Sequence, residues 1–276
     1  MTRLDFHAAK APLIMGIVNV TPDSFSDGGA YDALEQARRL IAEGADVLDI
    51  GGESTRPGAE PVSAAEEIAR VVPVITAIAA EWPGVISIDT LKPEVARAAY
   101  LAGATVWNDV TALSHTPESL AVAAELGGDV ILMHMQGEPR TMQAAPHYED
   151  VVAEVEAFLL KRAEAAMQAG VARERIWLDP GIGFGKTLDH NLALIRATAR
   201  LASHGFPVLM AASRKRFIAA LEEREGATPS GSDDRIGGTI AVHLHAIANG
   251  AKMVRVHDVL AMRQALRVWS ALKGHF

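Results

Sequence analysis

Polar residues that could bind a substrate recur at the ends of short apolar runs along this chain. They are Asn19, Asp49, Asp89, Asn108, His134, Asp179, Lys215, Arg255 and His257. Each alone has an ordinary explanation, because an aspartate that ends a strand often caps the following helix. A whole series of such groups is costly to bury unless they serve one another or a ligand. The pattern therefore favours a site built from carboxylates, amides and cations.

Two of these residues belong to the last apolar run and share one face of it. Alternate residues of a strand point the same way, so Arg255 and His257 face one side while Val254 and Val256 face the other. Arginine binds phosphate through two parallel hydrogen bonds, and histidine adds another donor. The pair is typical of an anion site; the alternative is a salt bridge to a neighbouring carboxylate.

The apolar runs that carry these residues predict a regular alternation of strands and helices. Strands are expected at residues 13–18, 45–50, 85–89, 104–109, 129–134, 175–179, 207–213 and 252–257. Helices are expected at residues 31–43, 63–81, from 93, from about 116, 148–169, 189–203, 234–249 and after the last strand, with a mobile loop at 222–231. Eight strands that alternate with eight helices indicate one (β/α)₈ barrel domain, a TIM barrel over residues 1–276. A doubly wound open sheet is the alternative, but no glycine fingerprint follows the first strand.

This barrel would gather the polar residues in one place, because active sites of (β/α)₈ barrels lie at the carboxyl ends of the strands. Two long loops at that end are rich in helix-breaking residues, one after residue 18 and one at residues 51–62. Loops of such length inside a compact domain are usually functional or disordered. The loops are therefore candidates to complete the site.

Composition narrows the class of protein. The net charge of −8 and the lack of a basic run disfavour nucleic-acid binding, so an anion must be captured by local cations. The absence of cysteine excludes disulfides, thiolate nucleophiles and cysteine zinc sites. No apolar stretch reaches the length of a membrane span. We expect a cytoplasmic protein that binds neither nucleic acid nor membrane.

Two tempting motifs do not fit their usual roles. Residues 181–187 resemble a phosphate loop, but Pro180 stands where its first glycine is required. The histidines show no His-Glu-x-x-His spacing, which argues against a histidine zinc site.

Five segments of the chain resemble the dihydropteroate synthases. They are residues 17–29 (IVNVTPDSFSDGG), 49–58 (DIGGESTRPG), 179–186 (DPGIGFGK), 213–215 (SRK) and 254–258 (VRVHD). Shorter segments at residues 87–90, 107–109 and 132–135 fit the same scheme, and all occur in the family's order. Related pterin-binding methyltransferase barrels share the aspartate and asparagine strand ends but are not expected to carry Ser-Arg-Lys together with Arg-x-His.

The resemblance implies a transferase of folate biosynthesis. It would condense 6-hydroxymethyl-7,8-dihydropterin diphosphate with 4-aminobenzoate, giving 7,8-dihydropteroate and pyrophosphate. It also implies Mg²⁺ as cofactor and a homodimer.

The resemblance assigns residues to each part of the substrates. The pterin would bind Asp89, Asn108, Asp179 and Lys215. The diphosphate would meet Arg255, His257, Asn19, Thr55 and Arg56, with Asn19 as the Mg²⁺ ligand. The aminobenzoate would be framed by Phe25, Asp27, Thr55, Arg56, Pro57, Phe184 and Arg216. Asn19, Lys215, Arg255 and His257 would serve catalysis.

Two residues depart from the family pattern. Ala211 stands where many relatives have glycine against the pterin, so one methyl group must be accommodated. Arg216 stands where a serine is common; it would either pair with the aminobenzoate carboxylate or be a solvated arginine in the first turn of a helix.

Three other functions remain open on the residues alone. A corrinoid-dependent methyltransferase would bind a folate without recognising pyrophosphate. A Schiff-base aldolase would use Lys215 on the seventh strand. A pterin-binding scaffold would have no activity.

Overall fold

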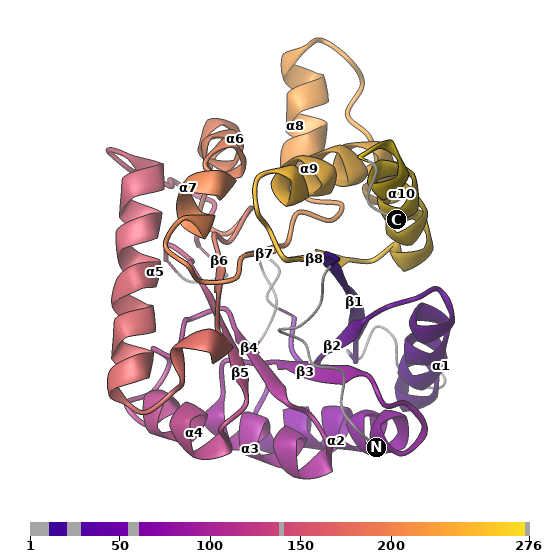
Figure 1. Cartoon of the computed structure of the whole chain (residues 1–276), viewed down its shortest axis with the longest axis vertical. Coiled ribbons are helices and arrows are strands. Elements are labelled where there is room, and N and C mark those ends of the chain that lie inside the picture. Colours follow the sequence, from indigo (N-terminus) through magenta and orange to yellow (C-terminus); the bar gives the residue numbers. More distant parts are fainter. Residues whose placement is uncertain (1–10, 21–28, 55–60, 138–140, 274–276) are drawn as a thin grey trace.

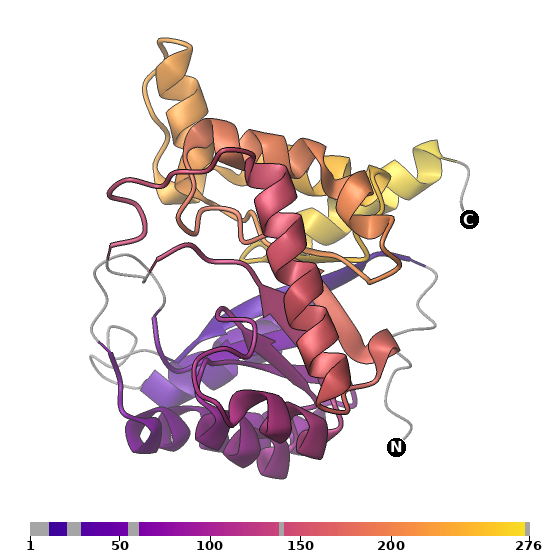
Figure 2. The same ribbon diagram turned by 90° about the vertical axis from the view of Figure 1, so that its left-hand side faces the viewer.

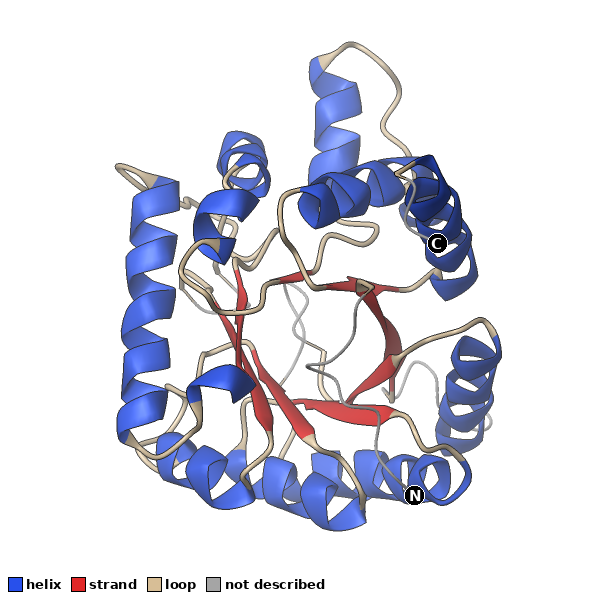
Figure 3. Cartoon of the chain, in the orientation of Figure 1, coloured by secondary structure: helices blue, strands red, loops and turns tan. Residues whose placement is uncertain are grey.

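Parallel strands form a closed ring at the centre of the molecule in the computed structural model, which describes residues 11–20, 29–54, 61–137 and 141–273 (Figure 3). The described strands are β1 (Leu13–Asn19), β2 (Val47–Gly51), β3 (Val85–Asp89), β4 (Val106–Asp109), β5 (Asp129–Met133), β6 (Ile176–Asp179), β7 (Leu209–Met210) and β8 (Met253–Val256). Their order in the sheet is β6-β5-β4-β3-β2-β1-β8-β7. A parallel bridge between Leu178 and Val208 joins β6 to the chain entering β7. The predicted (β/α)₈ barrel is therefore confirmed.

Helices surround the ring and shield its outer face (Figure 1). They are α1 (Gly29–Ala42), α2 (Ala64–Glu81), α3 (Pro93–Ala102), α4 (Ser119–Leu126), α5 (Val151–Gln168), α6 (Leu188–Arg196), α7 (Thr198–Ala202), α8 (Arg216–Arg224), α9 (Ile236–Ala248) and α10 (Val259–Leu272), with short 3₁₀ turns at Arg173–Arg175 and Ser232–Asp234. Among the described residues, no helix has both the length and the apolar character to cross a membrane.

The apolar side chains separate into two clusters because successive strand residues face opposite sides. A small cluster fills the barrel interior with one side chain from nearly every strand: Leu13, Met15, Val47, Val85, Val106, Ile131, Trp177, Leu209 and Met253. The larger cluster packs the outer strand faces against the helices and includes Val254 and Val256. Arg255 therefore faces the barrel interior, as the alternation along the last strand predicts.

Two predicted elements are shorter than expected, and each has a local cause. The predicted helix at residues 189–203 breaks at Ala197, beside Thr198, whose hydroxyl donates to Ile195 O at 2.7 Å. The predicted strand at 207–213 pairs with β8 only through Leu209 and Met210. Two residues further on, the Ala212 N–H donates to His243 Nε2 at 3.2 Å and not to a neighbouring strand.

A further helix, α8, follows β7 and overlaps the loop predicted at residues 222–231 at residues 222–224. It buries Phe217 and Ile218, and its last turn covers the first part of the predicted loop. In two perpendicular views α8 projects outward from the ring of helices (Figures 1 and 2). The Ser-Arg-Lys motif, residues 213–215, thus lies between β7 and α8 and leads directly into that helix.

Candidate active site

Four polar side chains from β2, β3, β4 and β8 form one hydrogen-bonded cluster at the barrel mouth. Arg255 Nε lies 2.5 Å from Asp49 Oδ2, and Arg255 Nη2 lies 2.7 Å from Asp89 Oδ2. Asn108 Nδ2 donates to the same Asp49 oxygen at 3.0 Å. Asp49 is fully buried, so this cluster places two carboxylates around one guanidinium in a poorly solvated space.

The electrostatics of the cluster depend on Arg255. Burial raises the pKa of Asp89 to about 7, although the positive charge of Arg255 opposes this shift. The two carboxylates in turn keep the pKa of Arg255 above its usual value despite burial. Among the described residues, Arg255 Nη1 has no hydrogen-bond partner. Arg255 therefore forms the salt bridge to neighbouring carboxylates, which is one of its two predicted roles. It also keeps N–H donors that could bind an anion, which is the other.

A second cluster comes from the ends of β6 and β7. Asp179 is buried, and its Oδ1 accepts a hydrogen bond from the Gly181 N–H at 2.7 Å. Lys215 donates through Nζ to Ile182 O and lies 4.2 Å from the centroid of the Phe184 ring. Burial lowers the pKa of Lys215 to about 8, while the charge of Asp179 opposes the shift. Asp179 thus offers a buried hydrogen-bond acceptor at the mouth, and Lys215 offers an amino group that titrates near neutral pH.

The glycine-rich loop after β6 is held by side chains at four successive carbonyls. Ile182 O accepts from Lys215, Gly183 O from Gln143, Phe184 O from Lys186 and Gly185 O from Tyr148. The Gly183 N–H donates to Asn191 Oδ1 at 2.7 Å. A loop without regular structure is thereby fixed as a rigid support for Phe184.

Gly181 is required by this loop both for its backbone conformation and for space. Its φ is +67°, and an added Cβ would lie 1.9 Å from His134 O. Gly127 has a similar φ of +62° but open space around the Cβ position. We expect Gly181→Ala to destabilise the protein by about 1–3 kcal/mol more than Gly127→Ala, because only the first adds overpacking to backbone strain. Urea denaturation of both variants measures the difference, and equal losses would contradict it.

Lys186 is buried under this loop and connects it to the end of β5. Its Nζ lies 2.9 Å from His134 Nδ1, 3.2 Å from His134 O and 3.0 Å from Phe184 O. Burial, together with the charge of Lys215, lowers the pKa of Lys186 to about 7. Burial also lowers the pKa of His134 to about 3, so this imidazole is neutral.

This lysine makes the stability of the protein depend on pH. A lysine in an unfolded chain titrates near about 10.4, so between about pH 7 and about pH 10 only the unfolded chain retains this proton. The wild type should therefore gain stability relative to Lys186→Met as pH rises, by up to about 1.4 kcal/mol per pH unit. Urea denaturation across this window measures the difference. Lys161→Met is the control, because it removes a lysine from an exposed position. Equal profiles for the two variants would contradict the prediction.

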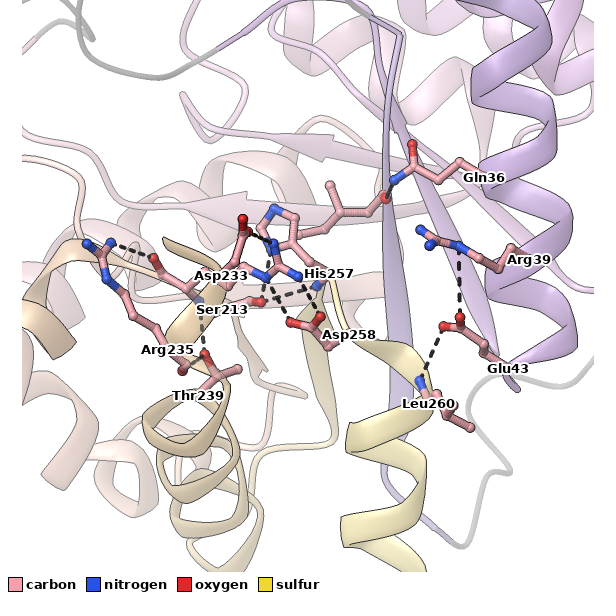
Figure 4. A network of polar contacts seen from close by, with 12 residues as sticks. Gln36, Arg39, Glu43, Ser213, Asp233, Arg235, Thr239, His257, Asp258 and Leu260 are labelled. Carbon is pink, nitrogen blue, oxygen red and sulfur yellow. Dashed lines mark hydrogen bonds and ion pairs between the residues drawn. The ribbon is translucent and has the colours of Figure 1, made fainter. Parts of the chain in front are cut away.

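His257 lies just after β8 and contacts the loop after β7. Ser213 Oγ lies 2.9 Å from His257 Nδ1 and also accepts the His257 N–H at 3.1 Å (Figure 4). Asn19 ends β1, at the same edge of the sheet, with a half-buried side chain. The predicted anion-binding residues are thus positioned at the carboxyl ends of adjacent strands β8 and β1.

The structure therefore brings together most of the residues that the sequence singles out. Asp89, Asn108 and Arg255 belong to the first cluster. Asp179, Lys215 and Phe184 form the second. Arg216 is exposed as the first residue of α8, and Ala211 is buried directly after β7. Phe25, Asp27, Thr55, Arg56 and Pro57 lie outside the described residues.

Three residues that organise the site have no assigned role in the sequence prediction. Asp49 lies in the middle of β2, and its link to Arg255 spans 206 positions and follows only from closure of the barrel. Lys186 and Ser213 stand inside the conspicuous motifs at 179–186 and 213–215. The sequence shows both motifs, but it does not show which residues the side chains of Lys186 and Ser213 contact.

Residues 15–257 match the family model described as pterin binding enzyme, so the chain belongs to the pterin-binding enzymes. The dihydropteroate synthase of Escherichia coli K12 is 47% identical over 264 residues, which cover 94% of this chain and 91% of that protein. The enzyme of the same name from Neisseria meningitidis serogroup B is 48% identical over 270 residues, covering 95% and 93%.

Solved structures agree with this assignment. The Xanthomonas albilineans dihydropteroate synthase with 4-aminobenzoic acid has a TM-score of 0.88 at 49% identity, covering 96% of this chain and 94% of that one. The same enzyme has been solved in complex with 7,8-dihydropteroate, with a TM-score of 0.85. Within the pterin-binding enzymes the chain belongs to the dihydropteroate synthases, which makes it a transferase of folate biosynthesis.

Proposed function

We propose that this barrel condenses 6-hydroxymethyl-7,8-dihydropterin diphosphate with 4-aminobenzoate and releases 7,8-dihydropteroate and pyrophosphate. The observation that carries the proposal is the presence of two buried polar clusters at the mouth, one with Asp89, Asn108 and Arg255 and the other with Asp179 and Lys215. Relatives at 46–49% identity have been solved with 4-aminobenzoic acid and with 7,8-dihydropteroate.

The pterin supplies what this cluster lacks. Ionised carboxylates only accept hydrogen bonds, so Asp89 and Asp179 need donors. The 2-amino group and a ring N–H of the pterin provide them, and Asn108 can both donate and accept. Lys215 offers a donor to the acceptor edge of the ring. Burial raises the pKa of Asp89 and of Asp179. Hydrogen bonds donated by the pterin would oppose this shift, because they stabilise the ionised carboxylates.

The diphosphate is expected next to the pterin, at Arg255, His257 and Asn19, because Arg255 contacts Asp89 directly. The Asp49 and Asp89 contacts fix the guanidinium plane in advance, so little rotamer freedom is lost on binding. Thr55 and Arg56, outside the described residues, are proposed to contribute from the loop after β2.

A Mg²⁺ ion fits this arrangement only together with the substrate. No group of three or more His, Cys, Asp or Glu residues in the described part of the chain could hold a metal ion, and the nearby carboxylates Asp49 and Asp89 are bound to Arg255. Magnesium commonly takes one or two protein oxygens plus substrate phosphate oxygens. Asn19 would provide its amide oxygen, and the bound ion would neutralise charge on the leaving group.

No residue of this chain then needs to act as a nucleophile. The residues need to stabilise the negative charge of the departing pyrophosphate and the positive charge left on the pterin methylene. The bond between the pterin methylene carbon and the diphosphate oxygen breaks, and the electron pair leaves with pyrophosphate. Arg255 and His257 hold that developing negative charge. The electron-rich ring, bound to Asp89 and Asp179, stabilises the cationic methylene. The arylamine nitrogen forms the new C–N bond and then loses a proton.

The aminobenzoate is proposed to stand against Phe184, together with Phe25, Asp27, Thr55, Arg56 and Pro57 from the loops outside the described residues. The rigid support of the 182–185 carbonyls fixes Phe184 at this place. Arg216 is exposed in the first turn of α8, near Lys215 in sequence. An ion pair between its side chain and the carboxylate of aminobenzoate remains a proposal.

Release of pyrophosphate that requires both substrates tests this function directly. A corrinoid-dependent methyltransferase would not release it, and an aldolase would instead be trapped at Lys215 by borohydride with a carbonyl substrate. Binding of the pterin without turnover would indicate a scaffold. We further propose that the protein is a cytoplasmic homodimer. Light scattering would measure the mass of the assembly.

A further inference from the structure

The chain segments that follow β7 and β8 are paired residue by residue. Ser213 contacts His257 through the two hydrogen bonds given above. The next residue, Arg214, forms a two-pronged bond with the residue after His257: its Nε lies 2.9 Å from Asp258 Oδ2, and its Nη2 lies 2.6 Å from Asp258 Oδ1. Figure 4 shows Ser213, His257 and Asp258 in one connected network. The two segments are thereby fixed relative to each other.

The backbone of Arg214 is held in an unfavourable conformation by its surroundings. Its φ is +56°, in the left-handed region, which costs a residue with a Cβ about 1–2 kcal/mol. The Arg214 N–H donates to Thr239 Oγ1 at 2.9 Å, and Arg235 Nη1 donates to Arg214 O at 3.1 Å. Both partners belong to the start of α9, and Thr239 is buried. Such strain persists only where several contacts enforce it, and it is concentrated at functional sites.

Each member of the Arg214–Asp258 pair stands next to a residue that is assigned to the substrate. Lys215 follows Arg214 directly and contacts Ile182 O and Phe184 on the pterin side of the mouth. His257 precedes Asp258 directly and lies on the diphosphate side. Arg214 itself contacts neither Asp89 nor Asp179; its side-chain partners are Asp258 and the exposed Asp233, whose side chain is 83% exposed.

The Arg214–Asp258 pair is poorly placed to contribute much to stability alone. Their side chains are 28% and 20% exposed, and partly solvated ion pairs typically contribute about 0–1 kcal/mol. A two-pronged contact does, however, restrict orientation strongly, because the planar guanidinium matches the carboxylate at two points. Geometry, more than binding energy, is what this pair provides.

We propose that Arg214 and Asp258 are positioning residues that couple Lys215, on the pterin side of the site, to His257, on the diphosphate side. This inference rests on the proposed function. Through the pair, a displacement of either segment displaces the other. The distance between Lys215 and His257 is therefore kept constant while the two halves of the substrate bind. A misplacement of about 1 Å can cost about 100-fold in rate.

The test compares Arg214→Lys and Asp258→Asn with Asp233→Asn as the matched control, which removes the exposed partner of the same arginine. In the purified full-length enzyme with Mg²⁺, kcat and KM for both substrates are measured, together with the Kd of pyrophosphate and the Tm. We expect kcat to fall about 10- to 100-fold in both positioning variants. Pyrophosphate and a pterin without diphosphate should both bind more weakly.

Two further comparisons separate positioning from a structural role. The double variant Arg214→Lys/Asp258→Asn should be no worse than either single one, because both remove the same contact. Asp233→Asn should keep kcat within twofold of the wild type. A lowered Tm with kcat within twofold in Asp258→Asn, or an equal loss in Asp233→Asn, would overturn the inference. A wild type without pyrophosphate release would instead overturn the proposed function, and the inference with it.

Discussion

Replacing Arg255 by methionine is expected to destabilise the protein by about 3–5 kcal/mol, because it leaves buried carboxylates without their cation. Arg255 contacts both Asp49 and Asp89, and Asp49 is fully buried. Among the described residues, Asp49 Oδ1 has no hydrogen-bond partner, so the charge of Asp49 is balanced mainly through its other oxygen. Methionine fills a similar volume, so the loss reports charge and hydrogen bonding more than packing. Urea denaturation near pH 8 measures the loss.

A double variant separates this effect from a general loss of packing. Asp49→Asn removes the buried charge, so the additional loss caused by Arg255→Met should be smaller in that background than in the wild type. The penalty should also shrink as pH falls toward about 7, because Asp89 without the opposing charge of Arg255 takes up its proton at a higher pH than in the wild type. Equal losses in both backgrounds would mean that Arg255 contributes through its hydrocarbon stem alone.

The positions of the site residues could be predicted because the fold imposes them. In a parallel barrel the carboxyl ends of all strands meet at one edge, so recognising the strands places Asp89, Asn108 and Asp179 together. Alternation along β8 likewise predicts that Arg255 faces inward and that Val254 and Val256 face the helices, as found. These inferences need only the period of a strand and the direction of the sheet.

The partners of those residues could not be predicted, because they depend on contacts between distant segments. Arg255 meets Asp49 across 206 positions and Asp89 across 166. The early end of β7 has a similar origin, since the Ala212 N–H is bound by His243 on α9. The break between α6 and α7 depends on a single hydroxyl, that of Thr198, which helical periodicity does not register.

The Asp179→Asn variant should bind a pterin without diphosphate about 5- to 150-fold more weakly than the wild type. Oδ1 of Asp179 already accepts the Gly181 N–H at 2.7 Å. In the variant the amide oxygen keeps that bond, which leaves the NH₂ group where the second carboxylate oxygen stood. A donor would then face the donors of the pterin, and an unpaired buried polar group costs about 1–3 kcal/mol. Isothermal titration calorimetry of both proteins measures the change.

Asp109 provides the control, because it is also buried and ends β4, which β5 separates from the strand of Asp179. Its carboxylate binds its own loop, accepting from the Thr111 N–H at 2.7 Å and the Leu113 N–H at 2.8 Å. Asp109→Asn should therefore lower stability, since Nδ2 cannot accept the second of these bonds, and leave the affinity for the pterin within about twofold of the wild type. Asp179→Asn should do the reverse, because only one oxygen of Asp179 is bound to the protein backbone. If both variants lose affinity equally, burial of a carboxylate at the mouth would explain the effect, and the pterin would not contact Asp179.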